Sequence, residues 1–422
     1  MLSWLIWKGT GMSRIDDLIK HLCPKGVEYK AIGDFGELLR GNGMPKSDFA
    51  ESGVGCIHYG QIYTYYGAWA TETISYVSAQ KAEKLTQVNP GDLIITNTSE
   101  NMDDVCKAVA WIGQYQVVTG GHATVLKHNQ DPRYLSYYMQ TPRFFTEKRR
   151  HATGTKVIDV SAKSLAKIMI PVPPLEVQRE IVKVLDTFRE LEVGLEAELE
   201  GELEARRRQY QYCRDTLLAF CDKEIRWDTL GEVGEFFRGR RFTKADYVED
   251  GVGCIHYGEI YTHYGISAIE VISHVRPEMK STLRFAKPGD VVITDVGETV
   301  EDVGKAVAWI GSEEVAIHDH CYAFRHSMNP KFVSYCMQTT SFIAEKAKYV
   351  ARTKVNTLLM NGFSKIRIPV PSLDEQERIV AILDKFDALV NDLSNRLPAE
   401  IKARRQQYAH YRDRLLSFSE AA

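Results

Sequence analysis

The segment HDHC, from His318 to Cys321, brings together three types of side chain that bind metal ions. A zinc or nuclease centre needs three or four ligands that converge on one point. An earlier, similar part of the chain reads GGHA at residues 120–123, so only His122 and His320 correspond between the two. We therefore predict no metal site, and we keep a stand-alone metal-dependent nuclease centred on residues 318–321 as the alternative hypothesis.

Motifs for other enzymatic chemistry are missing from the sequence. It contains no Walker phosphate loop, no G-x-S-x-G nucleophile motif and no H-E-x-x-H zinc motif. It also lacks the D/N-P-P-Y/F tetrapeptide of amino-methyltransferases, and PVPP at residues 171–174 offers no acid or amide to hold an adenine amino group. We predict a non-catalytic chain that needs no cofactor of its own.

Two polar loops offer groups that can form hydrogen bonds with the edges of nucleic-acid bases. They read TNTSENMDD at residues 96–104 and TDVGETVED at residues 294–302, and they differ sharply although the sequences around them are similar. Amide side chains can pair with adenine, and carboxylates can accept a hydrogen bond from cytosine. The predicted base-contacting residues are Asn97, Ser99, Asn101, Asp295 and Glu298. Glu298 is equally compatible with a surface acid.

Aromatic side chains lie in two further segments, QIYTYYG at residues 61–67 and EIYTHYG at residues 259–265. One interpretation is contact with bases by hydrogen bonding and stacking. The other is packing of aromatic side chains in the protein interior. With the two corresponding histidines, the predicted DNA-contacting residues of this group are Gln61, Tyr63, Tyr65, His122, Tyr261, His263 and His320.

Basic residues gather in RFFTEKRRHATGTK at residues 143–156 and in AEKAKYVARTK at residues 344–354, and Arg240 and Arg241 form a further basic pair. The net charge of the whole chain is −3, so contacts with phosphate groups must come from such local clusters. A solvated helix end is the alternative interpretation. The predicted phosphate-contacting residues are Arg149, Arg150, Thr155, Lys156, Arg240, Arg241, Arg352 and Lys354.

A duplicated unit must position all of these side chains. GVGCIHYG occurs at residues 53–60 and again at residues 251–258, an offset of 198 residues. KAVAWIG recurs at the same offset, and IPVPPLEVQREIVKVLD is followed by the related IPVPSLDEQERIVAILD. A repeat of this length indicates two tandem domains, each with its own core.

Each copy combines a globular part with a long helix. Residues 27–169 and 225–367 mix short β-rich runs with turn signals, and helical pairs are predicted at residues 134–151, where Pro142 interrupts, and at residues 332–350. The globular parts are therefore predicted to be mixed α/β domains.

The sequence changes in character after the proline cluster. Residues 175–220 contain no proline, and their apolar residues recur with helical spacing. LEAE-LEGE-LEAR at residues 195–206 aligns with LSNR-LPAE-IKAR at residues 393–404, where Pro398 is predicted to kink or restart the helix. At about 1.5 Å per residue, a helix of roughly 45 residues reaches about 65 Å, so it must span a distance or pair with its twin. The predicted helix-pairing residues are Ile181, Leu185, Phe188, Leu195, Leu199, Leu203, Ile379, Leu383, Phe386, Leu393, Leu397 and Ile401.

GTKVIDVSAKSLAKIMIPVPPLEVQREIVKVLD, followed by a long helix that ends in RRRQYQYCRDTLLAF, resembles the specificity (S) subunit of type I restriction–modification systems. The resemblance covers nearly the whole chain and both copies. It implies a DNA reader without catalytic activity, in which two target recognition domains each read one half of a split site. It also implies that the helices are conserved spacers that bind two methyltransferase (M) subunits, and that restriction/translocase (R) subunits join them. S-adenosylmethionine and ATP are then expected on the partner subunits.

The predicted fold class is mixed α/β, with two tandem globular target recognition domains, each followed by a long α-helix. The two helices are expected to pack as an antiparallel pair with pseudo-two-fold symmetry, which suits the two-fold symmetry of DNA. A homodimeric coiled coil is the alternative. The predicted domains are an N-terminal extension at residues 1–11, target recognition domains at residues 12–174 and 223–372, and spacer helices at residues 175–222 and 373–419.

Bulk composition is that of an ordinary soluble chain, with 44% hydrophobic and 26% charged residues. The N-terminal apolar run MLSWLIW is too short to cross a membrane. The eight cysteines form no C-x-x-C motif, which favours a reducing compartment. We expect a cytoplasmic protein without membrane contact.

Overall fold

The computed structural model describes residues 14–221, 224–352 and 355–421. The predicted N-terminal extension and Lys354 lie outside the described residues. Within those three ranges, no helix is both long and apolar enough to cross a membrane.

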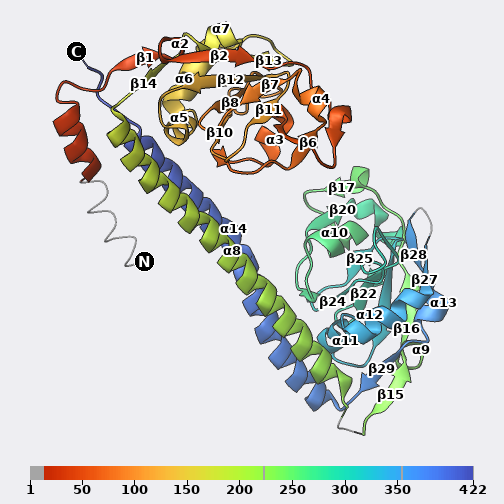
Figure 1. Cartoon of the computed structure of the whole chain (residues 1–422). Coiled ribbons are helices and arrows are strands. Elements are labelled where there is room, and N and C mark those ends of the chain that lie inside the picture. Colours follow the sequence, from red (N-terminus) through yellow and green to blue (C-terminus); the bar gives the residue numbers. More distant parts are fainter. Residues whose placement is uncertain (1–13, 222–223, 353–354, 422) are drawn as a thin grey trace. The chain divides into compact units, whose positions relative to one another are not determined.

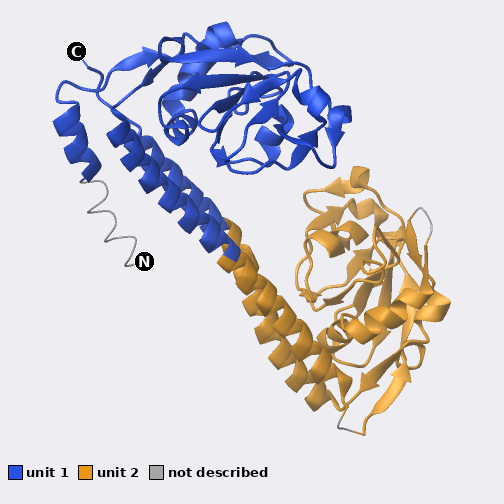
Figure 2. Ribbon diagram, viewed as in Figure 1, with its two compact units in different colours: residues 1–197, 399–422 blue, residues 198–398 orange. Residues whose placement is uncertain are grey.

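The chain divides into two compact units (Figure 2). Unit 1 comprises residues 1–197 and 399–422, and unit 2 comprises residues 198–398. Each unit holds one copy of the globular part and a piece of each long helix. The domain boundaries predicted from the sequence stay predictions.

Two five-stranded sheets form the globular part of unit 1 (Figure 1). In spatial order, the first sheet contains β2 (Gly36–Arg40), β12 (Ala123–His128), β8 (Leu93–Thr96), β10 (Ala108–Trp111) and β5 (Trp69–Ala70). The second contains β3 (Phe49–Ala50), β6 (Ser75–Val77), β4 (Val54–Ile57), β11 (Val117–Thr119) and β7 (Thr86–Val88). The short pairs are β1 (Tyr29–Ala31) with β14 (Met169–Pro171), and β9 (Thr98–Ser99) with β13 (Ile158–Asp159).

Unit 2 repeats this arrangement (Figure 1). Its first sheet contains β16 (Gly234–Arg238), β26 (Cys321–His326), β22 (Val291–Thr294), β24 (Ala306–Trp309) and β19 (Ser267–Ala268). Its second contains β17 (Tyr247–Val248), β20 (Ser273–Val275), β18 (Val252–Ile255), β25 (Val315–Ile317) and β21 (Phe285–Ala286). The short sheets are β15 (Arg226–Thr229) with β29 (Arg367–Val370), and β23 (Val296–Gly297) with β28 (Asn356–Leu358) and β27 (Val350–Ala351).

Short helices connect these strands. In unit 1 they are α2 (Ile32–Phe35), the 3-10 helix Lys46–Asp48, α3 (Tyr59–Thr64), α4 (Ala79–Ala82), α5 (Pro132–Tyr138), α6 (Pro142–His151) and α7 (Ala162–Leu165). In unit 2 they are α9 (Leu230–Val233), α10 (Tyr257–Thr262), α11 (Pro330–Cys336), α12 (Thr340–Lys346), α13 (Met360–Phe363) and the 3-10 helices Lys244–Asp246, Pro277–Thr282 and Ala347–Tyr349. The long helices are α8 (Leu175–Ala219) and α14 (Leu373–Leu415).

Pro142 lies between two helices because it starts the second of them. It occupies the first turn of α6, where the Thr141 hydroxyl accepts a hydrogen bond from the Phe144 backbone N–H. A proline is tolerated there because the first backbone N–H groups of a helix have no partner inside it. The predicted interruption of the helical segment is therefore a helix start.

The central strand of each first sheet is buried on both faces, which explains its unbroken apolar sequence. In β8, Leu93 and Ile95 lie in the core that contains α5, whereas Ile94 belongs to the cluster on the other side. Successive side chains of a strand point to opposite faces, so a strand covered on both sides is apolar throughout. The strand β22 repeats this alternation in unit 2.

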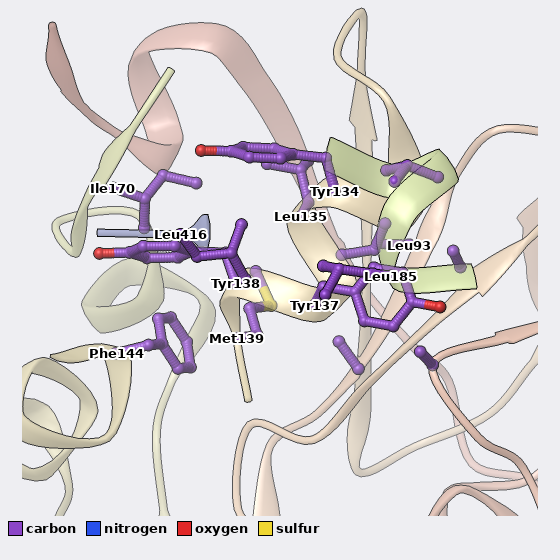
Figure 3. Close-up of a cluster of buried hydrophobic side chains, with 14 of the residues drawn as sticks. Leu93, Tyr134, Leu135, Tyr137, Tyr138, Met139, Phe144, Ile170, Leu185 and Leu416 are labelled. Atoms are coloured by element: carbon purple, nitrogen blue, oxygen red, sulfur yellow. The ribbon is translucent and has the colours of Figure 1, made fainter. Parts of the chain in front are cut away.

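The largest core of unit 1 lies where the globular part meets the long helices. Tyr137, Tyr138 and Leu185 belong to one buried cluster with Leu416 from the C-terminal end of the chain, and Figure 3 labels these side chains. At the start of α8, the Gln178 side-chain oxygen accepts from the Asp131 N–H at 3.0 Å, and its nitrogen donates to the Pro173 carbonyl at 2.7 Å. The glutamine of the IPVPPLxxQ segment thus fixes the start of α8 to the domain before it.

Carboxylates on the long helices form a second attachment, repeated in both units. Tyr137 donates its hydroxyl to Asp186 at 2.6 Å, and in unit 2 Tyr335 donates to Asp384 at 2.7 Å. Because these hydroxyls are otherwise surrounded by the core, the bonds satisfy groups whose burial would be costly.

The long helices run antiparallel within each unit. In unit 1, the Phe188 ring of α8 lies 5.9 Å from the Tyr411 ring of α14. About two turns further along α8, Glu196 accepts a hydrogen bond from Arg405 of α14 at 2.9 Å. In unit 2, Arg207 contacts Ser394 at 3.4 Å. In unit 1, the contacting residue on α14 changes from 411 to 405 as the one on α8 changes from 188 to 196. In unit 2, Asp387 is a neighbour of Tyr210, so the residue number on α14 again falls as the number on α8 rises. The two helices are therefore antiparallel in both units.

The predicted helix-pairing residues fall into two groups. The first group is buried and shares a core with the globular part: Ile181, Leu185, Phe188, Ile379 and Leu383. The second group is half-buried along the helices: Leu195, Leu199, Leu203, Phe386, Leu393, Leu397 and Ile401. Their assignment to pairing stays a prediction.

The helix α14 continues through Pro398, so it does not restart there, and the predicted kink stays a prediction. A proline removes one backbone hydrogen bond, and the helical turns on both sides keep theirs.

Candidate nucleic-acid interface

The two polar loops have the same backbone frame in both units. In unit 1, the Asn97 N–H donates to the His122 carbonyl at 2.8 Å, and the Asn97 carbonyl accepts from Val160 at 2.9 Å. In unit 2, the Asp295 N–H donates to the His320 carbonyl at 3.0 Å, and the Asp295 carbonyl accepts from the Leu358 N–H at 2.7 Å. Differences between the two sites therefore lie in the side chains.

The side chain of Asn97 is used inside unit 1. It is 4% exposed, its nitrogen donates to the Val160 carbonyl at 2.9 Å, and its oxygen accepts from Thr124 at 2.8 Å. Beside it, the Thr98 hydroxyl lies 3.0 Å from Nδ1 of the exposed His122. Contact of Asn97 with a base stays a prediction that this packing does not support.

Asp295 occupies the corresponding place in unit 2 but has different partners. One carboxylate oxygen accepts from Arg238 Nη2 at 2.9 Å, and the other lies 3.0 Å from His320 Nδ1. The Asp295 side chain is 4% exposed, whereas those of Arg238 and His320 are 49% and 40% exposed. A buried carboxylate thus holds two groups that face solvent.

The remaining loop residues lie closer to the surface. Asn101 is exposed and donates to Asp104 at 2.8 Å, and its N–H donates to Ser99 at 3.3 Å. Glu298 is also exposed, and its backbone carbonyl accepts from Asn356 at 2.8 Å. Their contact with bases stays a prediction.

The aromatic segments form short helices rather than strands. Gln61 caps α3 by accepting from the His58 N–H at 2.9 Å, and its nitrogen donates to Ser75. The Tyr63 hydroxyl donates to the Thr98 carbonyl, and burial raises its pKa to about 12. Tyr65, by contrast, is 64% exposed and available for stacking on a base.

Unit 2 follows the same division. Tyr261 donates its hydroxyl to the Val296 carbonyl, so it supports the polar loop of its own unit. His263, at the place of Tyr65, is exposed. In each unit, the first aromatic residue, Tyr63 or Tyr261, therefore supports the polar loop. The residue two places later, Tyr65 or His263, faces solvent.

The basic segments divide in a similar way. The exposed residues are Arg149, Arg150, Thr155, Lys156, Arg240, Arg241 and Arg352. Arg150 forms an ion pair with Glu147 at 2.6 Å, and this carboxylate offsets the positive charge that Arg150 could offer to a phosphate group. The other exposed cations remain candidates for phosphate contact.

Sequence reasoning missed two buried lysines in the basic segments. Lys148 donates to the Asp103 carbonyl at 2.9 Å, and Lys346 donates to the Glu301 carbonyl at 2.8 Å. Burial lowers the pKa of Lys148, and it lowers that of Lys346 to about 8. Each lysine thus holds the polar loop of its unit.

Arg238 is a third residue that sequence reasoning missed. It is the first residue of the segment RGRR at residues 238–241. The exposed cations of unit 2 include Arg238, Arg240, Arg241, Lys244 and Arg284. The segment RGNGMPK in unit 1 has neutral residues at the places of Arg240 and Arg241. The signal in the sequence was this difference in charge between otherwise similar copies.

The histidine-rich segment is held by hydrogen bonds inside unit 2. His318 Nε2 lies 3.0 Å from the Phe242 carbonyl oxygen, and its Nδ1 accepts from the His320 N–H at 3.1 Å. Burial lowers the pKa of His318 and raises that of the Cys321 thiol. Among the residues that the structure describes, no group of three or more His, Cys, Asp or Glu side chains is arranged to hold a metal ion. The nuclease hypothesis therefore gains no support from this segment.

Comparison with known proteins identifies the class. The type I restriction modification DNA specificity domain matches residues 24–205 and 224–403. The chain is 30% identical over 300 residues to the EcoR124I/EcoR124II type I restriction enzyme specificity subunit of Escherichia coli, covering 68% of this chain and 70% of that protein.

Solved structures show the same fold. One is a chain from a study of complex assembly and conformational transition of the type I R-M system, with a TM-score of 0.69, 18% identity, and coverage of 93% of this chain and 98% of that chain. Another is the HsdS subunit from Thermoanaerobacter tengcongensis, with a TM-score of 0.57, 16% identity, and coverage of 94% and 96%. This chain belongs to the type I restriction–modification specificity subunit family. The family resemblance and the fold class predicted from the sequence are confirmed.

Proposed function

We propose that this chain is the DNA-recognition subunit of a type I restriction–modification complex and has no catalytic activity of its own. The observation that carries the proposal is the repetition of one polar site on one backbone frame with different side chains, in two segments that both match the specificity domain. A shared frame with different side chains suits two readers of related but different DNA sequences.

Each globular part reads one half of a bipartite target. Because the two copies are related by duplication, similar reading surfaces give half-sites with inverted similarity, and the loop differences make the halves related rather than identical. Exposed cations such as Arg149 and Arg241 contact phosphates, and base edges are read beside the polar loops.

The partners are double-stranded DNA, two M subunits and R subunits in the cytoplasm. S-adenosylmethionine and ATP bind to those partner subunits. Apolar side chains exposed on the long helices favour docking of further chains there: Leu191, Val193, Tyr212 and Leu389. The chain by itself is expected to be poorly soluble or to bind DNA weakly, and co-expression with the M subunit should correct both.

Methylome sequencing tests this function. The full chain is co-expressed with its M subunit in a strain without other DNA methylation, beside a strain that carries the M subunit alone. We expect methylation at one bipartite motif only when both chains are present. Methylation without a common motif, or DNA cleavage by the purified chain with a divalent ion, would overturn the proposal.

A further inference from the structure

We propose that Arg238 reads a guanine in the half-site recognised by unit 2, and that Asp295 is the residue that positions it. This inference rests on the proposed function and names a specificity-determining residue within it.

The guanidinium of Arg238 is held along one edge. Its Nε donates to the Asp319 carbonyl at 2.7 Å, and its Nη2 donates to the Asp295 carboxylate at 2.9 Å. Among the described residues, no hydrogen bond involves Nη1. The edge formed by Nη1 and the second N–H of Nη2 therefore remains open on a side chain that is 49% exposed.

Asp295 is suited to orient Arg238 rather than to read a base itself. Its side chain is 4% exposed, and both carboxylate oxygens have partners in Arg238 and His320. A buried carboxylate is stable when it is paired and hydrogen-bonded in this way. Contact of Asp295 with a base stays a prediction that this burial does not support.

Unit 1 lacks this arrangement at the corresponding residues. Asn97 stands in the place of Asp295, and its side chain bonds to Val160 and Thr124. Arg40 stands in the place of Arg238; it is exposed and forms no ion pair within the described part of the chain. The fixed guanidinium is therefore a property of unit 2.

The open edge of Arg238 presents two parallel N–H donors, which match the paired acceptors O6 and N7 of guanine. A phosphate group also offers paired acceptors. Four other exposed cations of unit 2 already provide for phosphates: Arg240, Arg241, Lys244 and Arg284. A guanidinium fixed along one edge has lost the freedom to follow a phosphate, and this favours discrimination between bases.

The test uses the full chain with its M subunit and three variants: Arg238→Ala, Arg238→Lys and Arg40→Ala. Methylome sequencing gives the base preference at each position of both half-sites. We expect Arg238→Ala to lower the preference for guanine at one position of one half-site by about 10-fold or more. Arg238→Lys should not restore the preference, because lysine lacks the planar fork. Arg40→Ala is the matched control and should leave every position unchanged.

Binding assays at several salt concentrations separate the guanine contact from a phosphate contact. A uniform loss of affinity with a salt slope reduced by about one, and rescue by Arg238→Lys, would identify a phosphate contact and overturn the proposal. An equal loss of one base preference in Arg40→Ala would show that an arginine without a carboxylate partner reads a base equally well, and would overturn the positioning role of Asp295. Failure of the unaltered chain to direct methylation to any bipartite motif would instead reject the proposed function.

Discussion

Unit 1 and unit 2 share the hydrogen bonds that build their globular parts, whereas they differ beside their polar loops. Ser136 donates to the Ala68 carbonyl at 2.6 Å, and Ser334 donates to the Ile266 carbonyl at 2.9 Å at the corresponding place. Residues common to the two copies, such as these buried serines, therefore maintain the scaffold. Residues that differ are free to define what each copy contacts.

The differences beside the loops are coupled to one another. In unit 1, Thr98 contacts His122 and Thr124 donates to Asn97. Unit 2 has Val296 and Tyr322 at the places of Thr98 and Thr124. Val296 has no hydroxyl, and among the described residues the side-chain partners of Asp295 are Arg238 and His320. The differences at these positions therefore come with a different set of hydrogen-bond partners in each unit.

The shared core gives the largest expected effect. Leu185→Ala in unit 1 and Leu383→Ala in unit 2 each remove a fully buried side chain. Each change should lower the free energy of unfolding by about 2–5 kcal/mol, because a cavity is left in a packed core. Calorimetry measures the effect, with Leu191→Ala, at a half-exposed residue, as the control. If the free energy of unfolding fell by less than about 1 kcal/mol in one unit but not in the other, the two cores would not be equivalent.

Exchange of the loop residues should show an asymmetry. Asn97→Asp removes the amide donor to the Val160 carbonyl and buries a carboxylate, and should cost about 2–4 kcal/mol. Asp295→Asn keeps an oxygen that accepts from Arg238 and should cost about 1 kcal/mol. Urea unfolding measures both free energies. Equal costs would contradict the different roles assigned to the two residues.

The buried lysines predict a pH dependence. The pKa of Lys346 is lowered from 10.5 to about 8 by burial, so the unfolded chain binds more protons between these values. Stability should therefore rise with pH across this window, by up to about 3 kcal/mol, and Lys346→Met should remove that rise. Lys148 donates to two carbonyl oxygens, of Asp103 and Val105, so Lys148→Met should remove a smaller rise. An unchanged pH profile in Lys346→Met would show that the lysine is not held as a buried cation.

Sequence reasoning predicted the repeated features of the molecule better than the individual contacts. The duplication and the start of α8 at Leu175 follow from patterns that recur along the chain, and the antiparallel pairing of the long helices was predicted from the family resemblance. The partners of Asn97 and Asp295 could not be predicted in this way, since Val160 and Arg238 lie 63 and 57 residues away in the sequence. The role of Gln61 as a helix cap was missed because no helix was predicted at residues 61–67, where the structure has α3.

The long helices give the smallest expected change. Insertion of a further LEGE after Glu202 lengthens α8 by about 6 Å and turns it only about 40° beyond a full revolution. In the proposed function, the half-sites should then move apart by one or two base pairs, because base pairs stack at about 3.4 Å. Their sequences should stay the same. A two-residue insertion rotates the apolar face by roughly 200° and should prevent assembly, which makes it the control. An unchanged spacer in a functional four-residue variant would show that the helices do not set the spacing.

The central claim is that each globular part reads its own half of the target. The most direct test replaces residues 225–367 with residues 27–169, so that both units carry the first copy, and maps the methylated motif with the same M subunit. We predict a motif made of two identical, inverted copies of one parental half-site. A motif that keeps both parental half-sites would contradict the account.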